Sequence, residues 1–217
     1  IVFMKFIKNI FTYLFILIFA NLSAQYFPKN APKNLEQKAE KYADSLYQQL
    51  SLDEKIGQLY IVALYNNRGE EEIQKIRNLV EKEKIGGLIL MQDNAEKHIQ
   101  LLNEFQGKSK VKMMIGIDGE WGLSMRLRGT PVFPRNMVLG CIRDNRLLYE
   151  YGREVARQCR QIGVQVNFAP VADVNINPKN PVINTRSFGE NPIQVADKVI
   201  AYASGLESGG VLSVCKH

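Results

Sequence analysis

The segment Met113-Met-Ile-Gly-Ile-Asp-Gly-Glu-Trp-Gly122 places a short apolar run directly before a carboxylate and a glycine-containing turn. An apolar run of this length is typical of a buried strand in a parallel sheet. Asp118 then stands at the carboxyl end of that strand. Ligand sites of α/β folds are built at this end of the sheet, so the segment predicts both a fold class and a place for chemistry.

Strand-like and helix-like segments alternate on either side of this stretch. Helical periodicity and short apolar runs predict, in chain order, a strand at 58–63, a helix at 70–84, a strand at 85–90, a helix at 95–105, a strand at 112–118, a helix at 144–162, a strand at 164–173, a helix at 192–208 and a strand at 211–215. Strands that are apolar on both faces are typical of a parallel sheet covered by helices. A doubly wound open sheet and a (β/α)8 barrel both satisfy this order.

The polar residues favour the barrel. They cluster where strands end, as at a barrel rim, and no dinucleotide-binding fingerprint follows the first strand. Five strands are fewer than the eight that close a barrel. We therefore predict an α/β fold, a truncated (β/α)8 TIM-type barrel of about the first five β/α units, preceded by a signal peptide.

The amino-terminal segment is typical of a secretory signal. Two lysines precede a short apolar run at 10–20, and a small residue, Ala24, closes the segment. We predict a signal peptide at 1–24 with Met4 as the true start, and hence an exported protein, periplasmic or extracellular. An uncleaved anchor helix is the alternative, but the run is shorter than the ~20 apolar residues of a membrane span. No stable membrane span is expected after cleavage.

Beyond the predicted signal, residues 25–50 indicate a linker and an amphipathic helix. A capping box at Ser51-Leu-Asp-Glu54 starts a further short helix. We therefore place the incomplete barrel at 51–217.

Composition excludes several classes of function. The apolar content of 46% and the charged content of 23% are ordinary for a soluble globular protein. The formal net charge is +6, but the basic residues alternate with Glu and Asp on helical patterns, so nucleic-acid binding is not expected. The chain contains no CxxC, no HExxH, no glycine-rich phosphate loop and no serine nucleophile elbow. No metal or organic cofactor is predicted.

Cysteine and histidine carry little functional information by themselves. The odd number of cysteines favours small buried apolar side chains over a disulfide framework or a metal site. Cys159 falls on the apolar face of a predicted helix and Cys215 in a predicted buried strand. His98 lies in a polar helical stretch, and we expect it to be exposed.

Asp118 and its neighbours are the first candidate site residues. A carboxylate here suits a bidentate grip on adjacent sugar hydroxyls, because hydroxyl-to-carboxylate hydrogen bonds are charge-assisted. A helix N-cap or a structural ion pair is the alternative. Arg126 either braces Asp118, reaches the ligand or lies on the surface. Trp121 either stacks on the apolar face of a sugar or packs in the core.

The second group of candidates comes later in the chain. Arg186 lies in a long irregular loop, a kind of segment that often carries function, and its guanidinium offers planar two-pronged donation. An ion pair with Glu190 or Asp173 is the alternative. We predict a structural role for Asp173, holding Arg186 or nearby amides. Lys216 and His217 can donate to hydroxyls from the end of a strand, and His217 can also titrate near neutral pH.

Five motifs together resemble the N-terminal barrel of glycoside hydrolase family 3, within which the β-N-acetylhexosaminidase branch is most similar. In chain order they are Ile85-Gly-Gly-Leu-Ile-Leu90, Ile117-Asp-Gly-Glu-Trp-Gly122, Asn167-Phe-Ala-Pro-Val-Ala-Asp-Val-Asn175, Asn180-Pro-Val-Ile-Asn-Thr-Arg-Ser-Phe-Gly-Glu190 and Lys216-His217. The resemblance runs from about Ser51 to His217. It implies that five residues bind the non-reducing-end sugar in the first subsite: Asp118, Arg126, Arg186, Lys216 and His217.

The resemblance also implies a retaining mechanism, in which a carboxylate forms a covalent glycosyl-enzyme and a proton donor assists the leaving group. In the family the nucleophile is an Asp late in the barrel. In the hexosaminidase branch the acid/base is a His, oriented by an Asp, on the loop after the Lys-His pair. Neither position lies in this chain, so we assign no catalytic residue to it, and the family pattern does not make Glu120 the nucleophile.

The expected function is therefore removal of terminal β-linked N-acetylhexosamine, for example from cell-wall or glycan fragments, by a longer protein of which this chain is an inactive fragment. A β-glucosidase or xylosidase of the same family is one alternative. A non-catalytic secreted barrel that binds sugars is another.

Overall fold

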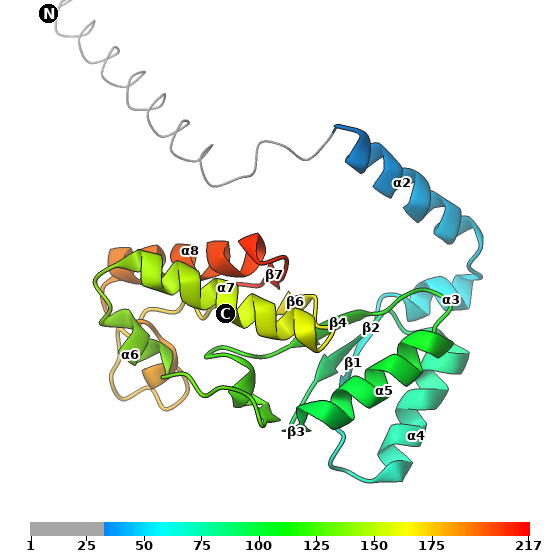
Figure 1. Cartoon of the computed structure of the whole chain (residues 1–217), viewed down its shortest axis with the longest axis horizontal. Helices are drawn as coiled ribbons and strands as arrows, with labels where there is room; N and C mark the ends of the chain where they lie inside the picture. Colours follow the sequence, from blue (N-terminus) through cyan, green and yellow to red (C-terminus); the bar gives the residue numbers. More distant parts are fainter. Residues whose placement is uncertain (1–32) are drawn as a thin grey trace, which may run out of the picture. The chain divides into compact units, whose positions relative to one another are not determined.

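The computed structural model describes residues 33–217 (Figure 1). The predicted signal peptide at 1–24 lies outside these residues. The chain divides after Gln49 into two compact units. The described part of the first is helix α2 (Lys33–Gln48), and the second is the α/β unit Leu50–His217. No helix between 33 and 217 combines the length and the apolar character that crossing a bilayer requires.

A five-stranded parallel sheet forms the centre of the α/β unit. In spatial order its strands are β1 (Ile61–Leu64), β2 (Gly87–Leu90), β4 (Met114–Ile117), β6 (Val166–Asn167) and β7 (Leu212–Ser213). All neighbouring strands pair in parallel. The spatial order follows the chain order without a reversal, whereas a doubly wound sheet needs one. Because β-α-β connections are right-handed, this order places the connecting helices on one face.

The helices follow local capping signals closely. They are α3 (Leu52–Gly57), α4 (Glu70–Asn78) with its π-helical extension η1 (Leu79–Glu83), α5 (Ala95–Lys108), α6 (Asn136–Gly140), α7 (Asn145–Gln161) and α8 (Pro192–Ser208). The predicted capping box is present, since Ser51 and Glu54 each cap the other's backbone N–H. The predicted bounds of α8 are confirmed because Asn191 caps its first turn and Pro192 opens it.

Short elements were not predicted from the sequence. Helix α6 is one of them, and two 3-10 turns, η2 (Leu123–Met125) and η3 (Asn184–Arg186), are others. A two-stranded parallel sheet also forms between β3 (Asp93–Asn94) and β5 (Leu127–Arg128). The pairing of β3 with β5 brings the loop after β4 back towards the loop after β2.

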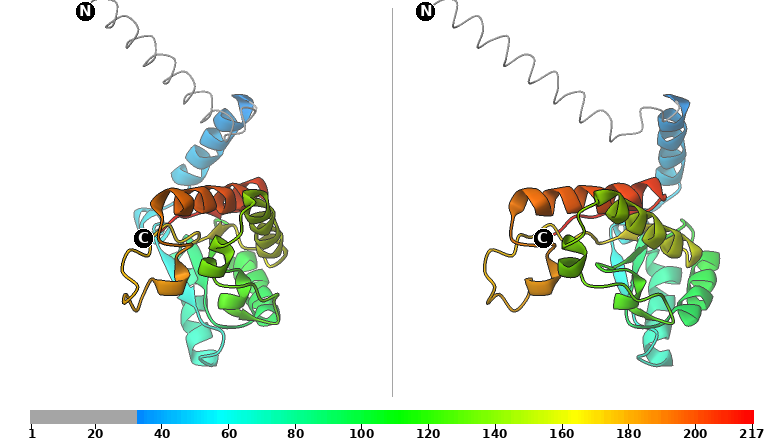
Figure 2. Two further views of the ribbon diagram at one scale, coloured as in Figure 1. Left: turned by 90° about the vertical axis from the view of Figure 1, so that its left-hand side faces the viewer. Right: turned by 60° about the vertical axis from the view of Figure 1, so that its left-hand side comes forward.

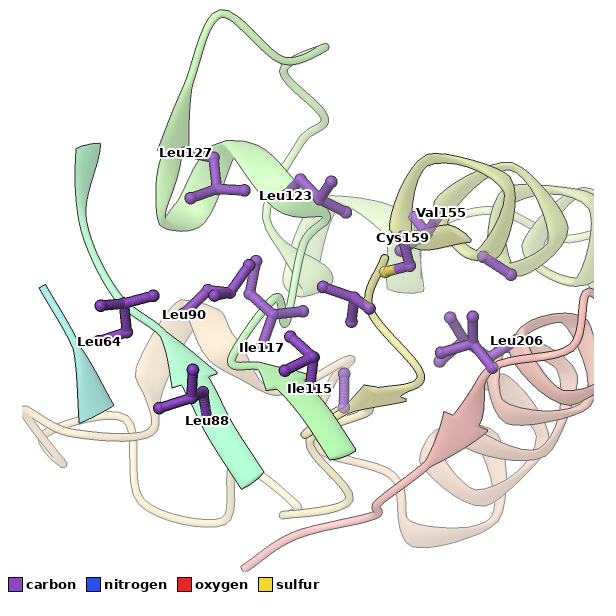
Figure 3. Close-up of a cluster of buried hydrophobic side chains, with 14 of the residues drawn as sticks. Leu64, Leu88, Leu90, Ile115, Ile117, Leu123, Leu127, Val155, Cys159 and Leu206 are labelled. Atoms are coloured by element: carbon purple, nitrogen blue, oxygen red, sulfur yellow. The ribbon is translucent and has the colours of Figure 1, made fainter. Parts of the chain in front are cut away.

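The hydrophobic core lies between one face of the sheet and the helices. Leu88 and Leu90 of β2 stand in register with Ile115 and Ile117 of β4, and all four are buried. Figure 3 shows this row beside Leu64 and near side chains from the loop after β4, from α7 and from α8: Leu123, Leu127, Val155, Cys159 and Leu206. The row is continuous because alternate side chains of a strand share a face.

The other face of the sheet is more open. Ile61 and Met114 belong to the row that points away from this core, and they are 47% and 46% exposed. On the outer strand β7, Leu212 is 56% exposed. The strands are therefore apolar on both faces, as predicted, but in the described residues the helices cover one face only.

Helices α7 and α8 pack closely against each other (Figure 2). Gly152 and Gly205 meet at the crossing, and a Cβ atom on Gly205 would overlap the carbonyl oxygen of Tyr149. Glycine is therefore required there by the separation of the two backbones.

Two predictions about single residues are wrong. His98 is fully buried, with Nε2 2.9 Å from the Met91 carbonyl oxygen. It shares the inward face of α5 with Leu101, Leu102 and Phe105, at helical spacing that the polar neighbours concealed. Cys215 is exposed, because β7 ends at Ser213. Cys141 is also exposed, whereas Cys159 is buried as predicted, and burial raises the pKa of its thiol to about 12.

Candidate functional site

The candidate site lies beyond the carboxyl ends of β4, β6 and β7. Asp118 follows β4 directly. Lys216 is placed by a short parallel bridge to Val171, in which the Ala172 N–H donates to the Lys216 carbonyl oxygen at 2.7 Å. Segments that are far apart in sequence thus meet at one edge of the sheet.

Asp118 is held between two cations. Its Oδ2 accepts a hydrogen bond from Arg126 Nη2, and its Oδ1 accepts one from Lys216 Nζ. The Asp118 side chain is 19% exposed, so it remains open to solvent on one side. Arg126 comes directly after the 3-10 turn η2, and that turn directs its side chain back to Asp118.

Glu120 also forms an ion pair with Lys216, the lysine that contacts Asp118. Lys216 Nζ lies 2.9 Å from Glu120 Oε1. Arg186 grips Glu120 with two donors, Nε to Oε2 at 2.9 Å and Nη2 to Oε1 at 2.7 Å. The Glu120 side chain has no solvent exposure. A two-pronged pair of this kind fixes the orientation of both side chains and stabilises the ionised carboxylate.

His217 completes the network. Its Nδ1 lies 2.7 Å from Asp173 Oδ2, and its Nε2 lies 3.0 Å from Arg186 Nη2. A guanidinium can only donate, so Nε2 accepts and Nδ1 carries the hydrogen that Asp173 accepts. In this arrangement the imidazole is the neutral tautomer.

Buried side chains hold the loops that carry the ion pairs. Asn167, at the end of β6, accepts from the Gly119 N–H at 3.0 Å and donates to the Gly119 carbonyl oxygen at 3.1 Å. Gly119 lies between Asp118 and Glu120, so this clamp fixes both carboxylates. Asn136 Nδ2 donates to the Arg186 carbonyl oxygen at 2.8 Å and holds the second loop.

The electrostatics follow from these contacts. Burial opposes ionisation of both carboxyls, but hydrogen bonds outweigh it: those from Lys216 and Arg126 lower the pKa of Asp118, and those from Arg186 and Lys216 lower the pKa of Glu120. The hydrogen bonds to Glu120 also raise the pKa of Arg186. Both carboxyls are therefore ionised at neutral pH.

The structure brings the five predicted residues together, and two further carboxylates join them. Asp173 was predicted to have a structural role, holding Arg186 or nearby amides; its carboxylate contacts His217, which in turn contacts Arg186. Glu120 was missed as a member of the network. A signal was present, since Asp118 and Glu120 are two positions apart and such residues share a face of extended chain. The role of the five residues in binding sugar stays a prediction.

Trp121 is not packed in the core, and its stacking on a sugar stays a prediction. It is half-buried, and the guanidinium of Arg135 lies over its ring at 4.4 Å from the centroid. Within residues 33–217 no group of three or more His, Cys, Asp or Glu side chains is placed to hold a metal ion.

Comparison with known proteins identifies the family of the chain. The pattern that defines the Glycosyl hydrolase family 3 N terminal domain matches residues 51–217. The chain belongs to glycosyl hydrolase family 3. The matched residues include all five predicted site residues and both of the additional carboxylates.

Relatives in this family carry hexosaminidase names. "Beta-hexosaminidase A" of Pseudoalteromonas piscicida is 33% identical over 156 residues, which cover 66% of this chain and 26% of that protein. "Beta-hexosaminidase LpqI" of Mycobacterium tuberculosis is 32% identical over 174 residues, which cover 77% of this chain and 43% of that protein. The chain thus spans less than half the length of these family 3 proteins.

A solved family 3 structure is similar in fold over the matched residues. It is a β-N-acetylglucosaminidase from Paenibacillus sp. str. FPU-7, with a TM-score of 0.68 and 33% sequence identity. The match covers 77% of this chain and 33% of that one.

Proposed function

We propose that this chain is the amino-terminal part of a retaining β-N-acetylhexosaminidase that removes terminal N-acetylhexosamine from the non-reducing end of a glycan. The observation that carries the proposal is the convergence of Asp118, Arg186 and Lys216 in one ion-pair network at the carboxyl edge of the sheet. The names of its family 3 relatives support the choice of sugar.

The geometry suits a ligand rich in hydroxyls. Asp118 is partly exposed and offers carboxylate lone pairs to adjacent hydroxyls, while its ion pair with Arg126 fixes its orientation. Lys216 uses two of its three donors on Asp118 and Glu120, which leaves one for a ligand. His217 is 43% exposed and forms the outer edge of the network.

We also propose that the sheet belongs to a closed (β/α)8 barrel in the whole protein. Two observations support this: the strand order has no reversal, and the face of the sheet without helices exposes apolar side chains such as Ile61 and Met114. In a barrel this face points inward and is covered by the remaining strands. Those strands would also supply the nucleophile, and the loop after Lys216 and His217 would supply the acid/base.

Export is a further part of the proposal. The predicted signal at 1–24 implies that the mature protein acts in the periplasm or outside the cell. Its export is checked by determining the amino terminus of the mature protein after expression of the whole gene. A mature protein that retains residues 1–24 contradicts it.

The activity is tested by hydrolysis of chromogenic N-acetyl-β-glucosaminide, β-glucoside and β-xyloside by the whole protein. We expect turnover of the first, and none by the 217-residue chain alone. Asp118→Asn is expected to raise KM at least tenfold, because a neutral amide weakens charge-assisted bonds to hydroxyls. Glu104→Gln, in an ion pair on α5 outside the site network, is the matched control and should leave KM unchanged.

The outcomes separate the alternatives. Faster turnover of the glucoside or xyloside would identify a glucosidase or xylosidase of the same family. Sugar binding without any turnover by the whole protein would identify a non-catalytic barrel.

A further inference from the structure

The ion-pair network is balanced in charge. It contains three cations, Arg126, Arg186 and Lys216, and three carboxylates, Asp118, Glu120 and Asp173. His217 adds no charge, because its Nε2 accepts from Arg186 and its Nδ1 donates to Asp173.

Glu120 differs from Asp118 in its exposure to solvent and in the partners of its carboxylate oxygens. Its side chain is completely buried, whereas the Asp118 side chain is 19% exposed. Both Glu120 oxygens are used by donors of the protein, Oε1 by Lys216 and Arg186 and Oε2 by Arg186. Glu120 therefore cannot contact a ligand and acts only through the two cations that it holds.

Without the charge of Glu120, the network would carry a net charge of +1. Arg186 and Lys216 both contact Glu120 Oε1, so they are close to each other and would repel without this shared anion. Arg186 would keep the Val182 carbonyl oxygen, at 3.2 Å from Nη1, and His217 as partners. Lys216 would keep Asp118 alone among the carboxylates of the network.

We propose that Glu120 is a positioning and specificity-determining residue that makes the site select uncharged sugars over sugars that carry a carboxylate. It fixes Lys216 and Arg186 at the spacing that a hexose requires, and it cancels the positive charge that would otherwise attract an anionic hexose. This inference rests on the proposed function, because it assumes that the network holds a sugar.

The test compares Glu120→Gln with the wild-type whole protein. The probes are N-acetylglucosamine and N-acetylglucosaminuronic acid, which differ only in the carboxylate at C6, and their dissociation constants are measured by titration calorimetry. In the wild type the uncharged sugar binds more tightly. In Glu120→Gln its affinity falls, and the preference for it over the carboxylate sugar falls by about tenfold, the effect of one unit charge in a partly exposed site.

Two further variants separate charge from folding. Glu104→Gln removes a carboxylate that pairs with Arg77, and it should leave both affinities unchanged. Lys216→Gln makes the opposite change of charge, so it should increase the preference for the uncharged sugar even where its absolute affinity falls. This variant decides the question if Glu120→Gln does not fold.

Each outcome has one meaning. An unchanged preference in Glu120→Gln, with both affinities intact or both reduced equally, overturns the role in selectivity, and so does a shift of the same sign in Lys216→Gln. A wild-type protein that binds neither sugar overturns the proposed function, and this inference with it. A wild type that binds N-acetylglucosamine but does not prefer it over the carboxylate sugar overturns the inference alone.

Discussion

Replacement of Asn167 by alanine should destabilise the protein and loosen the candidate site together. Asn167 is fully buried, and its amide makes both hydrogen bonds to Gly119, at 3.0 and 3.1 Å. A buried polar group that loses its partner costs ~1–3 kcal/mol. The Gly119 N–H would lose its partner entirely, while the carbonyl oxygen would keep the Gly122 N–H at 3.1 Å and the Tyr202 hydroxyl at 3.4 Å. We therefore expect a loss of about 2–3 kcal/mol in the free energy of unfolding.

The structure supplies a matched control for this variant. Gln106 makes the same pair of hydrogen bonds to the backbone of Met113, at 2.8 and 3.0 Å, at the opposite end of β4. Its side chain is only half-buried, so water can replace it. Gln106→Ala should cost about 1 kcal/mol or less and should leave sugar binding unchanged.

Urea unfolding followed by circular dichroism measures both variants, and calorimetry measures the affinity for N-acetylglucosamine. For Asn167→Ala we expect weaker binding as well as lower stability, because the loop that carries Asp118 and Glu120 is no longer clamped. Equal losses of stability in Asn167→Ala and Gln106→Ala, or a cost below about 0.5 kcal/mol for the former, would refute the reasoning.

Two other predictions follow from packing and from ion pairing. Gly205→Ala should lower the free energy of unfolding by ~1–3 kcal/mol or more, because the added methyl group forces α7 and α8 apart. Thermal unfolding measures this loss, and an unchanged melting temperature would show that the helix crossing adapts without cost. Hydrogen bonds from Arg77 lower the pKa of Glu104 to about 2, so the pair stabilises the fold above the pKa of the unfolded chain, and this contribution is lost as pH falls from about 5 towards 2. Since both side chains are partly exposed, we expect the ion pair to contribute ~0.5–1 kcal/mol to the free energy of unfolding. Unfolding of Glu104→Gln should therefore depend less on acid than unfolding of the wild type. Equal acid dependence of the variant and the wild type would contradict the prediction.

The sequence predicted the elements whose signals are local. The predicted starts of α8, at Pro192, and of α3, after Ser51, are confirmed, because signals at helix starts satisfy or remove backbone groups within a few residues. Strand bounds were less accurate. The apolar pattern at 164–173 predicted one long strand, but β6 pairs only at Val166–Asn167, since pairing depends on neighbours that periodicity cannot reveal.

The membership of the site could be predicted only in part. Asp118 and Lys216 stand out because each follows an apolar strand. Glu120 does not, because its significance lies in a partner that is distant in sequence, Arg186. Asp173 ends the predicted strand at 164–173, but its partner His217 is also distant in sequence and was not predicted. His98 was misplaced for a similar reason, since its burial depends on which face of α5 meets the sheet.

The bridge between Asp118 and Lys216 joins residues 98 positions apart. Closing a loop of that length is entropically costly, and contacts of such separation tend to slow folding. The network can therefore form only after the intervening strands and helices have assembled and β7 has joined β6. The ability to hold a ligand at this place thus reports that assembly of the α/β unit is finished, and a partly assembled chain has no cluster of opposed charges to offer.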